Sequence, residues 1–170
     1  MANNLIHIDQ SDLNRLNMNM RDFERELMSV CKNALKNLGA RIIADAQTTL
    51  RRKQNVATGM LVNSGSVKEG ADNSIMAGFP TMYAYFVEFG RKAGKWPPFQ
   101  AIYQWVRVTH MTSDPNEEKS LAFLIQRSIG QKGTRPHPFL RPAYEKNKPL
   151  LVRVLMKGAA KVMNKDYTRR

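Results

Sequence analysis

The chain has 170 residues, of which 27 are Lys or Arg and 14 are Asp or Glu, giving a formal net charge of +13. A content of 42% hydrophobic and 24% charged residues excludes wholesale disorder, and the length predicts a single domain over residues 1–170. The single cysteine, Cys31, excludes a disulfide framework and a cysteine-based zinc site. No apolar run is long enough to span a bilayer, so we expect no membrane partner. The N-terminal residues MANNLIHIDQ lack the features of a signal sequence, which favours a reducing cytosol, or an assembly built there.

The first pattern along the chain is helical. Apolar residues recur at steps of three and four between Leu13 and Ala46, which predicts a long amphipathic helix from about Asn19 to about Arg52. Gly39 is a weak point inside this helix. The spacing is close to a heptad, so a coiled-coil seam is one interpretation. A helix lying over a sheet is favoured, because charged residues do not mark the flanking positions consistently. Residues 1–18 are expected to form an extended or partner-bound arm.

A change of pattern after this helix indicates a β-hairpin. The first strand is expected within Met60–Lys68, a turn over Glu69–Asn73, and the second strand over Ser74–Phe79. Gly65 marks either a β-bulge or a close approach of the backbone to a neighbouring element. The hairpin is the basis of the small antiparallel sheet that we expect.

The apolar block Met82–Gly90 is too short for its periodicity to distinguish a strand from a helix. Gly90 at its end, followed by two basic residues, favours a short helix with a glycine C-cap. The segment Lys95–Pro98 is then a rigid connector. Pro98 suits the first position of a middle helix that continues to Val108.

A second middle helix has a well-defined start. Asp114 is predicted as its N-cap, Pro115 as its first residue, and Glu117 as the residue whose carboxylate reaches back to the cap. The helix is expected to end near Gly130. The loop Gln131–Pro138 that follows is rich in glycine, proline and basic residues.

The C-terminal part is predicted to be helical with one break. A short helical turn fits Pro142–Asn147, and a longer helix is expected from Pro149 to about Lys165, because proline cannot continue a helix. Basic residues recur every four positions on this last helix and form one stripe. This basic stripe consists of Arg153, Lys157, Lys161 and Lys165. The whole pattern predicts an α+β fold with a long N-terminal helix, a small antiparallel β-sheet built on a hairpin, two middle helices and a C-terminal helix.

The positive charge is concentrated in the second half of the chain. Residues 1–90 carry 10 Lys or Arg and 9 Asp or Glu, whereas residues 91–170 carry 17 and 5. A half this basic attracts a polyanion or an acidic protein surface. A basic face that only keeps the protein soluble is an alternative of equal weight.

The residue types that usually carry catalysis are scattered. His7, His110 and His137 lie in separate segments without metal-ligand spacing. Cys31 falls on or beside the apolar stripe of the long helix, where a buried structural thiol is favoured over a nucleophile. No glycine-rich phosphate loop and no nucleophile elbow occurs in the sequence. We therefore predict that the protein is not an enzyme and needs no cofactor or metal.

Two groups of residues leave alternatives open. Glu88, inside an apolar block, is either a buried partner of an arginine, holding a loop or a neighbouring subunit, or an ordinary exposed glutamate. Aromatic residues interleave with basic ones in the second half, as in proteins that clamp phosphates and stack on bases. For Trp96 and Trp105, anchoring of the core is favoured over stacking on bases. No nucleic-acid-binding motif is matched.

Three blocks of sequence, taken in order, resemble a known family. They are Thr58–Ser64 (TGMLVNS), Tyr83–Gly90 (YAYFVEFG) and Gly133–Ala143 (GTRPHPFLRPA), with a long helix before and after them. Together with the connector Gly94–Pro98 and the helical segment Ala122–Ile125, they make the chain similar to the neck or tail-completion proteins of tailed bacteriophages, the minor-tail-protein-Z-like group. The resemblance covers most of the chain.

This resemblance implies a non-enzymatic structural protein of the virion, assembled in the host cytoplasm as a homo-oligomeric ring at the head–tail junction. The genome passes through such a ring, so DNA in the channel is one implied contact. The implied protein partners are head-completion or portal-side proteins on one side, and tail terminator or tail tube proteins on the other. The alternative is a non-specific nucleic-acid-binding protein that acts through its basic C-terminal half.

The signature positions of the family carry over as structural and interface residues. Gly59, Gly90 and Gly133 permit tight chain reversals, while prolines stiffen a loop that Phe139 anchors. A rigid loop loses little entropy on docking, which suits a contact repeated around a ring. The expected assembly residues are Tyr83, Glu88, Phe89, Gly90, Trp96, Gly133, Arg135, Pro136, Pro138, Phe139 and Arg141. The two arginines are expected to project from the loop, and the basic stripe to face a partner or DNA.

Overall fold

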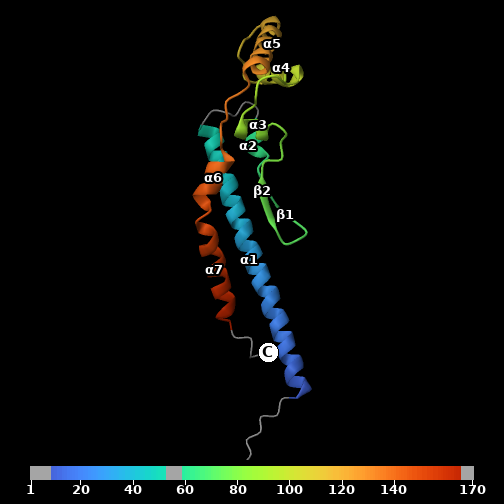
Figure 1. Cartoon of the computed structure of the whole chain (residues 1–170), viewed down its shortest axis with the longest axis vertical. Coiled ribbons are helices and arrows are strands. Elements are labelled where there is room, and N and C mark those ends of the chain that lie inside the picture. Colours follow the sequence, from blue (N-terminus) through green and yellow to red (C-terminus); the bar gives the residue numbers. More distant parts are fainter. Residues whose placement is uncertain (1–8, 53–58, 166–170) are drawn as a thin grey trace, which may run out of the picture.

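The computed structural model describes residues 9–52 and 59–165 and shows an elongated α+β protein that is mostly helical (Figure 1). In chain order its elements are α1 (Gln10–Arg52), α2 (Met60–Asn63), β1 (Ser66–Glu69), β2 (Ile75–Gly78), α3 (Ala84–Phe89), α4 (Phe99–Val108), α5 (Pro115–Lys132), α6 (Leu140–Asn147) and α7 (Leu150–Met163). Helix α1 runs along most of the molecule, with α6 and α7 packed along one side of it and the β-hairpin along another. The predicted fold class is confirmed.

Helix α1 begins earlier than the predicted Asn19. Its start is fixed by Asp9, whose carboxylate Oδ1 accepts the backbone N–H groups of Ser11 (2.8 Å) and Asp12 (2.9 Å), as an N-cap residue does. Residues 10–18 are therefore helical and not extended, which corrects that part of the predicted arm. The rest of the predicted arm, residues 1–8, lies outside the described residues.

The β-hairpin packs against α1 at Gly39. The strands are antiparallel, with Val67 opposite Ala77, and a Cβ atom on Gly39 would lie 3.3 Å from Cγ1 of Val67. The glycine that we expected to weaken the helix lies inside it without a break and lets the strand approach the helix closely.

The first strand of the hairpin is shorter than predicted, because residues 60–63 form the single helical turn α2 instead of a strand. Of the two interpretations of Gly65, the structure shows the close approach. A Cβ atom on Gly65 would lie 2.6 Å from Cγ2 of Ile43 and 2.9 Å from Cε1 of Phe79. Gly65 therefore allows the chain to pass tightly between α1 and the end of the hairpin.

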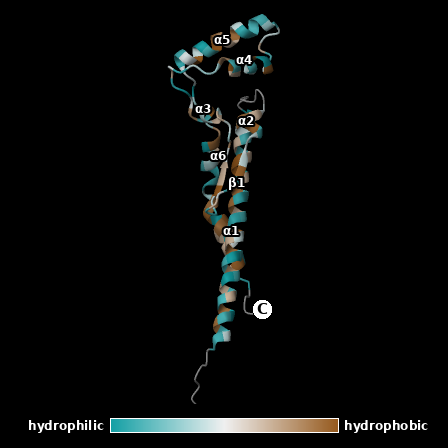
Figure 2. Cartoon of the chain, turned by 90° about the vertical axis from the view of Figure 1, so that its right-hand side faces the viewer, coloured by the Kyte–Doolittle hydropathy of each residue, from teal (hydrophilic) through white to brown (hydrophobic). Residues whose placement is uncertain are grey.

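Helices α4 and α5 pack against each other and lie across one end of the molecule (Figure 2). Val106 from α4 and Ala122 from α5 are fully buried. Together with the connector, these two helices form a small helical unit beyond the end of α1 (Figure 1).

The N-cap predicted for α5 is confirmed, because Asp114 Oδ1 accepts the backbone N–H of Asn116 at 2.8 Å. Glu117 does not reach back to the cap directly as predicted. The Thr112 hydroxyl donates to its carboxylate (2.6 Å) and accepts the backbone N–H of Asp114 (3.3 Å), so Thr112 lies between the two acidic residues. The helix continues to Lys132, slightly beyond the predicted end.

The other predicted boundaries are close to the observed ones: Pro98 is the N-cap of α4 and not its first residue, α6 begins at Leu140 and not at Pro142, and α7 ends at Met163 and not near Lys165. Helix α3 ends at Gly90, whose φ of 74° lies in the region that favours glycine. The break between α6 and α7 falls at Lys148–Pro149, as the proline predicted.

The main hydrophobic core lies around the C-terminal half of α1, where α2, α3 and α6 meet it. Its buried residues are Ile43, Ala46, Leu50, Leu61, Val62, Phe79, Ala84, Phe139 and Ala143. Burial of apolar side chains is the dominant favourable term in folding. This core therefore holds α2, α3 and α6 against α1, and each of these three helices begins in one of the three sequence blocks of the family resemblance.

Candidate assembly site

The three sequence blocks of the family resemblance meet in this one core. Leu61 and Val62 come from the first block, Ala84 from the second, and Phe139 and Ala143 from the third. Thr58, which opens the first block, lies outside the described residues. Segments that are far apart in the sequence are thus parts of a single structural unit.

Phe139 anchors the loop to this unit, which is the role that the family resemblance implies for it. It is almost completely buried, and its ring meets the ring of Phe79 edge to face, with centroids 5.1 Å apart. An aromatic pair in this geometry stabilises by about 0.5–1.5 kcal/mol beyond the area that it buries. The third block is therefore anchored to the end of the hairpin.

Glu88 makes the most specific polar contact of the site. Its side chain is 7% exposed. The carboxylate accepts the backbone N–H groups of Phe139 (2.8 Å) and Leu140 (2.9 Å) through Oε2, and that of Arg141 (2.9 Å) through Oε1. A carboxylate at a helix N-terminus gains both from charge-assisted hydrogen bonds and from the helix dipole.

The contact settles the two interpretations of Glu88. The residue is buried and holds the loop, as in the first interpretation, but the partners of its carboxylate are backbone N–H groups and not an arginine guanidinium. The N-cap residue of α6, Phe139, has no side chain that accepts a hydrogen bond, and no side-chain cap is present there. Glu88 therefore supplies from α3 the cap that α6 lacks.

Backbone hydrogen bonds hold the loop before α6 against α3 and against the residues that follow α3. The backbones of Arg91 and Thr134 exchange two hydrogen bonds (3.0 and 2.8 Å), and the His137 N–H donates to the Val87 carbonyl (2.8 Å). Gly133, with a φ of 72°, passes so close to the Arg91 carbonyl that no Cβ atom would fit. The predicted chain reversals at Gly90 and Gly133 are thus part of one contact.

The outer side of α3 is an exposed aromatic patch. It consists of Met82, Tyr83, Tyr85, Phe86 and Phe89. The rings of Tyr85 and Phe89 lie 5.0 Å apart, and the Arg91 guanidinium lies over the Phe86 ring at 5.0 Å. Contiguous apolar surface of this kind on a folded protein marks an interaction site. Of these five residues, only Tyr83 and Phe89 are among the assembly residues expected from the sequence.

The other predicted assembly residues fall into two groups. Arg135, Pro136 and Arg141 are exposed beside the loop, as predicted, while Pro138 is half-buried. Trp96 lies elsewhere, on the α4–α5 unit, where its ring covers Gly130: a Cβ atom on Gly130 would lie 2.9 Å from Cδ2 of the indole.

The predictions for the tryptophans and the cysteine are corrected in part. Trp96 contacts α5 with its ring but is half exposed, so it is not a fully buried core anchor, and Trp105 is half-buried. Cys31 is half-buried on α1.

The basic stripe lies on α7 and just beyond its end, and α7 lies away from α3 (Figure 1). Arg153, Lys157 and Lys161 are exposed, whereas Lys165 Nζ contacts both carboxylate oxygens of Glu26 on α1 at 2.8 Å. The stripe and the aromatic patch are therefore separate surfaces. Its last member also fastens the end of α7 to α1.

Two further polar contacts, which the sequence analysis missed, hold neighbouring elements on α1. Asp45 accepts hydrogen bonds from Lys146 Nζ (2.9 Å) and Asn147 Nδ2 (2.6 Å) of α6, and these bonds, that of Lys146 first, lower the pKa of the Asp45 carboxyl. Glu69 on the hairpin contacts Lys32 and Lys36, whose hydrogen bonds lower the pKa of its carboxyl in the same way.

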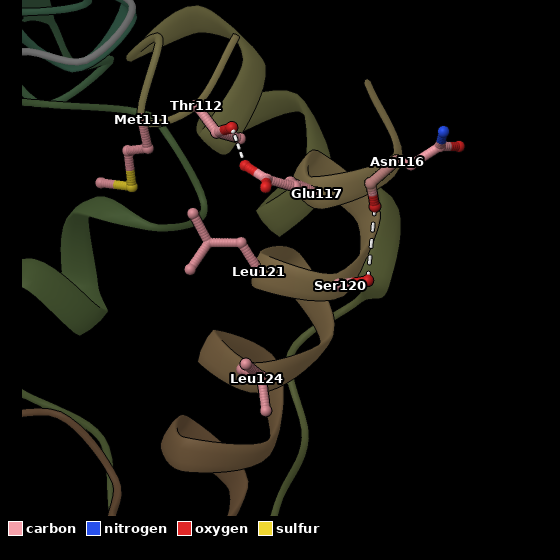
Figure 3. Close-up of a pocket in the computed structure, with 7 residues that line it drawn as sticks. All are labelled: Met111, Thr112, Asn116, Glu117, Ser120, Leu121 and Leu124. Atoms are coloured by element: carbon pink, nitrogen blue, oxygen red, sulfur yellow. Dashed lines mark hydrogen bonds between the residues drawn. The ribbon is translucent and has the colours of Figure 1, made fainter. Parts of the chain in front are cut away.

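A shallow pocket lies apart from the assembly residues, between the α4–α5 connection and the first turns of α5 (Figure 3). Apolar side chains such as Leu121 and Leu124 line it, and the Thr112–Glu117 hydrogen bond closes one side. Within the described ranges, no three His, Cys, Asp or Glu side chains are grouped so that they could hold a metal ion. Among the described helices none combines the length and apolar character needed to cross a bilayer.

Comparisons with known proteins found no family model that matches the chain, and no curated protein or solved structure that is significantly similar to it.

Proposed function

We propose that this chain is a structural protein of the head–tail junction of a tailed bacteriophage. In this proposal it forms a ring in the neck of the virion, joins the head-completion or portal side to the tail, and lets DNA pass. The observation that carries the proposal is the convergence of the three resembling blocks on one core, with Phe139 buried at its centre.

The use of these residues supports a structural role. In the second and third blocks, Glu88 binds the start of α6, and the backbones of Arg91 and Thr134 are paired. These contacts make the loop before α6 a rigid element with arginines on its surface. A rigid element loses little entropy when it docks, which suits a joint between two large assemblies.

The exposed surfaces provide the contacts that a joining protein needs. The aromatic patch on α3 offers apolar area to a protein partner, and Arg135 and Arg141 offer charge beside it. We assign this side of the molecule to a head-side or tail-side partner. The residues of α7 and of the N-terminal part of α1 remain for contacts between copies.

The test is removal of the gene from the virus that encodes this chain. The expected result is an accumulation of DNA-filled heads and separate tails, which electron microscopy of lysates shows directly, and whose joining is restored by the wild-type gene supplied in trans. The proposal is overturned if the deletion virus still forms normal particles, or if virions of the wild-type virus do not contain this chain. Genes for portal, capsid and tail tube proteins beside this gene would support it further.

The second candidate function is non-specific binding of nucleic acid, and the observation that favours it is the exposed row of Arg153, Lys157 and Lys161 on α7. Neutralisation of phosphates by such a row gives an affinity that falls steeply with salt. Fluorescence anisotropy with a duplex of random sequence, at salt concentrations from about 50 to about 200 mM, measures how steeply the affinity falls with salt. This alternative is favoured if the monomeric chain binds the duplex with an affinity that falls steeply with salt, and if the variant Arg153→Ala, Lys157→Ala, Lys161→Ala loses that binding.

A further inference from the structure

The N-terminal part of α1 extends beyond the helix that covers the rest of it. Helix α7 ends at Met163, and Lys165, two residues beyond it, contacts Glu26, so the N-terminal part of α1, residues 10–25, projects past the end of α7 (Figure 1). We call residues 10–25 the projecting segment. Its apolar side chains Leu13, Leu16 and Met20 are exposed. Apolar surface left exposed on a folded protein marks an interaction site, so this apolar side is a surface for a partner.

The exposed side chains continue a seam that α7 covers further along. From Leu13 through Leu16 and Met20 to Val30, apolar residues alternate at steps of three and four, which are the a and d positions of a heptad. At Val30 the seam is covered by α7, because a Cβ atom on Gly158 would lie 3.0 Å from Cγ1 of Val30. The seam that packs inside the molecule is therefore left without its covering helix at the N-terminal end.

The charges around the projecting segment are segregated. Asp12 and Glu24 occupy positions that flank the seam on its two sides, and no basic residue occupies a flanking position between residues 12 and 26. The basic residues of the segment occupy the positions that face away from the seam; they are Arg15, Arg21 and Arg25. Flanking charges are inconsistent over the whole helix, but this segment presents an apolar stripe with acidic borders.

The complementary surface is the outer face of α7. Val152, Met156 and Met163 are exposed there and form a second apolar stripe. The basic stripe runs beside it, and no acidic residue occurs between residues 150 and 165. The 14 residues of α7 span ~21 Å and the projecting segment spans ~24 Å. The two surfaces therefore match in length, apolar character and opposite charge.

We propose that the projecting segment of one copy docks on the outer face of α7 of a second copy. The two apolar stripes are buried together, and the acidic border of the projecting segment that lies on the side of the neighbour's basic stripe faces it. Two different surfaces meet, so every copy offers one of each, and the contact repeats head to tail. Such a contact generates a ring when the rotation between copies closes. The inference rests on the proposed function only in expecting this chain to self-assemble.

Two full-length variants test the contact, with self-association measured by sedimentation velocity. One carries Leu16→Glu and Met20→Glu on the projecting segment, and the other carries Met156→Glu and Lys157→Glu on α7. Each is expected to weaken self-association by about tenfold or more, which corresponds to about 1.4 kcal/mol. Circular dichroism checks that the helices remain. The matched control is Met18→Glu, because Met18 is 61% exposed against 58% for Met20 and lies on the opposite side of the helix.

A mixture of the two defective variants identifies the head-to-tail arrangement. Each variant keeps one intact surface, so an equimolar mixture is expected to form a 1:1 complex that does not grow further. The proposal is overturned by a wild-type chain that stays monomeric, by an equal loss in Met18→Glu, or by a mixture without the 1:1 complex. Loss of association in the α1 variant alone also overturns it, because that result indicates pairing of two α1 segments.

The outcome is separable from the test of the proposed function. A chain that associates head to tail but is missing from virions overturns the role at the head–tail junction and leaves the contact in place. A chain found at the junction whose mixed variants do not pair overturns the contact alone.

Discussion

The carboxylate of Glu88 lies 2.8 Å from the backbone nitrogen of Phe139, although 51 residues separate the two in the sequence. The same carboxylate also accepts the next two N–H groups of α6. One side chain thus joins α3 to the start of α6 and fixes the loop between the α4–α5 unit and α6.

Replacement of Glu88 by alanine leaves the N–H groups of Phe139, Leu140 and Arg141 without their acceptor. We expect the free energy of unfolding to fall by about 3 kcal/mol, and by about 1 kcal/mol in Glu88→Gln, which keeps one acceptor oxygen. Urea unfolding followed by circular dichroism measures both. Glu145→Ala, at an exposed position of α6, is the control and is expected to change the value by less than about 0.5 kcal/mol. Equal effects in Glu88→Ala and Glu145→Ala contradict the cap.

Gly65→Ala is expected to destabilise the protein by about 1–3 kcal/mol, because its Cβ would meet Ile43 and Phe79 inside the core. Gly78→Ala is the matched control, since no atom lies within 4 Å of the Cβ position there. Thermal unfolding distinguishes the two variants: the melting temperature should fall in the first and stay unchanged or rise slightly in the second. A Gly65→Ala variant as stable as the wild type would show that the chain does not pass between α1 and the hairpin as described.

Stability is expected to fall in acid through Asp45 and Glu69. Hydrogen bonds from Lys146 and then Asn147 hold the pKa of Asp45 below its ordinary value, and those from Lys32 and Lys36 do so for Glu69. A lowered folded-state pKa gives stability that is fully present above the unfolded-state pKa and is lost as the pH falls through the folded-state pKa. The melting temperature should therefore fall below about pH 4.

Asp45→Asn isolates one part of this pH dependence. The variant should melt at a lower temperature than the wild type at pH 7, and its melting temperature should change less with pH between about 4 and 2. Lys146→Ala, which removes the largest cause of the lowered pKa, should flatten the profile in the same direction. Acid profiles of both variants that run parallel to the wild-type profile would exclude this contribution.

Phe89→Glu tests the aromatic patch as a partner surface. Phe89 is 60% exposed, so the melting temperature should change by no more than about 2 °C, while co-purification with head-side or tail-side neck proteins is lost. Met60→Glu is the control, because Met60 is 62% exposed outside the patch. If Phe89→Glu still binds its partners as Met60→Glu does, the patch is not the contact.

Local chemistry accounts for the parts of the fold that the sequence predicted well. Asp114 caps α5 through a residue two positions away, and Pro149 ends α6 because of its own ring. Gly90 ends α3 with a positive φ. In each case the physical cause lies within a few residues of the boundary, so the sequence pattern contains it. The same reasoning applied to Asp9 would have placed the start of α1 correctly.

Contacts between distant segments account for what the sequence analysis missed. Nothing near Glu88 indicates that its partners are backbone groups 51 residues away. The indirect signal was that α6 starts at Phe139–Leu140 with no side chain suited to cap it. Likewise, the Asp45–Asn147 hydrogen bond depends on the packing of α6 on α1. For residues 60–63, a short apolar run did not distinguish a helical turn from a strand.

Helix α1 is continuous from Gln10 to Arg52, and no proline interrupts it. At about 1.5 Å per residue it is a rod of ~65 Å, with the projecting segment at one end and the core around Leu50 at the other. A long helix without a kink-forming residue bends only gently. A force applied to the projecting segment is therefore transmitted along α1 to the core. If the projecting segment tilts, the aromatic patch at the other end of the molecule changes its orientation as well.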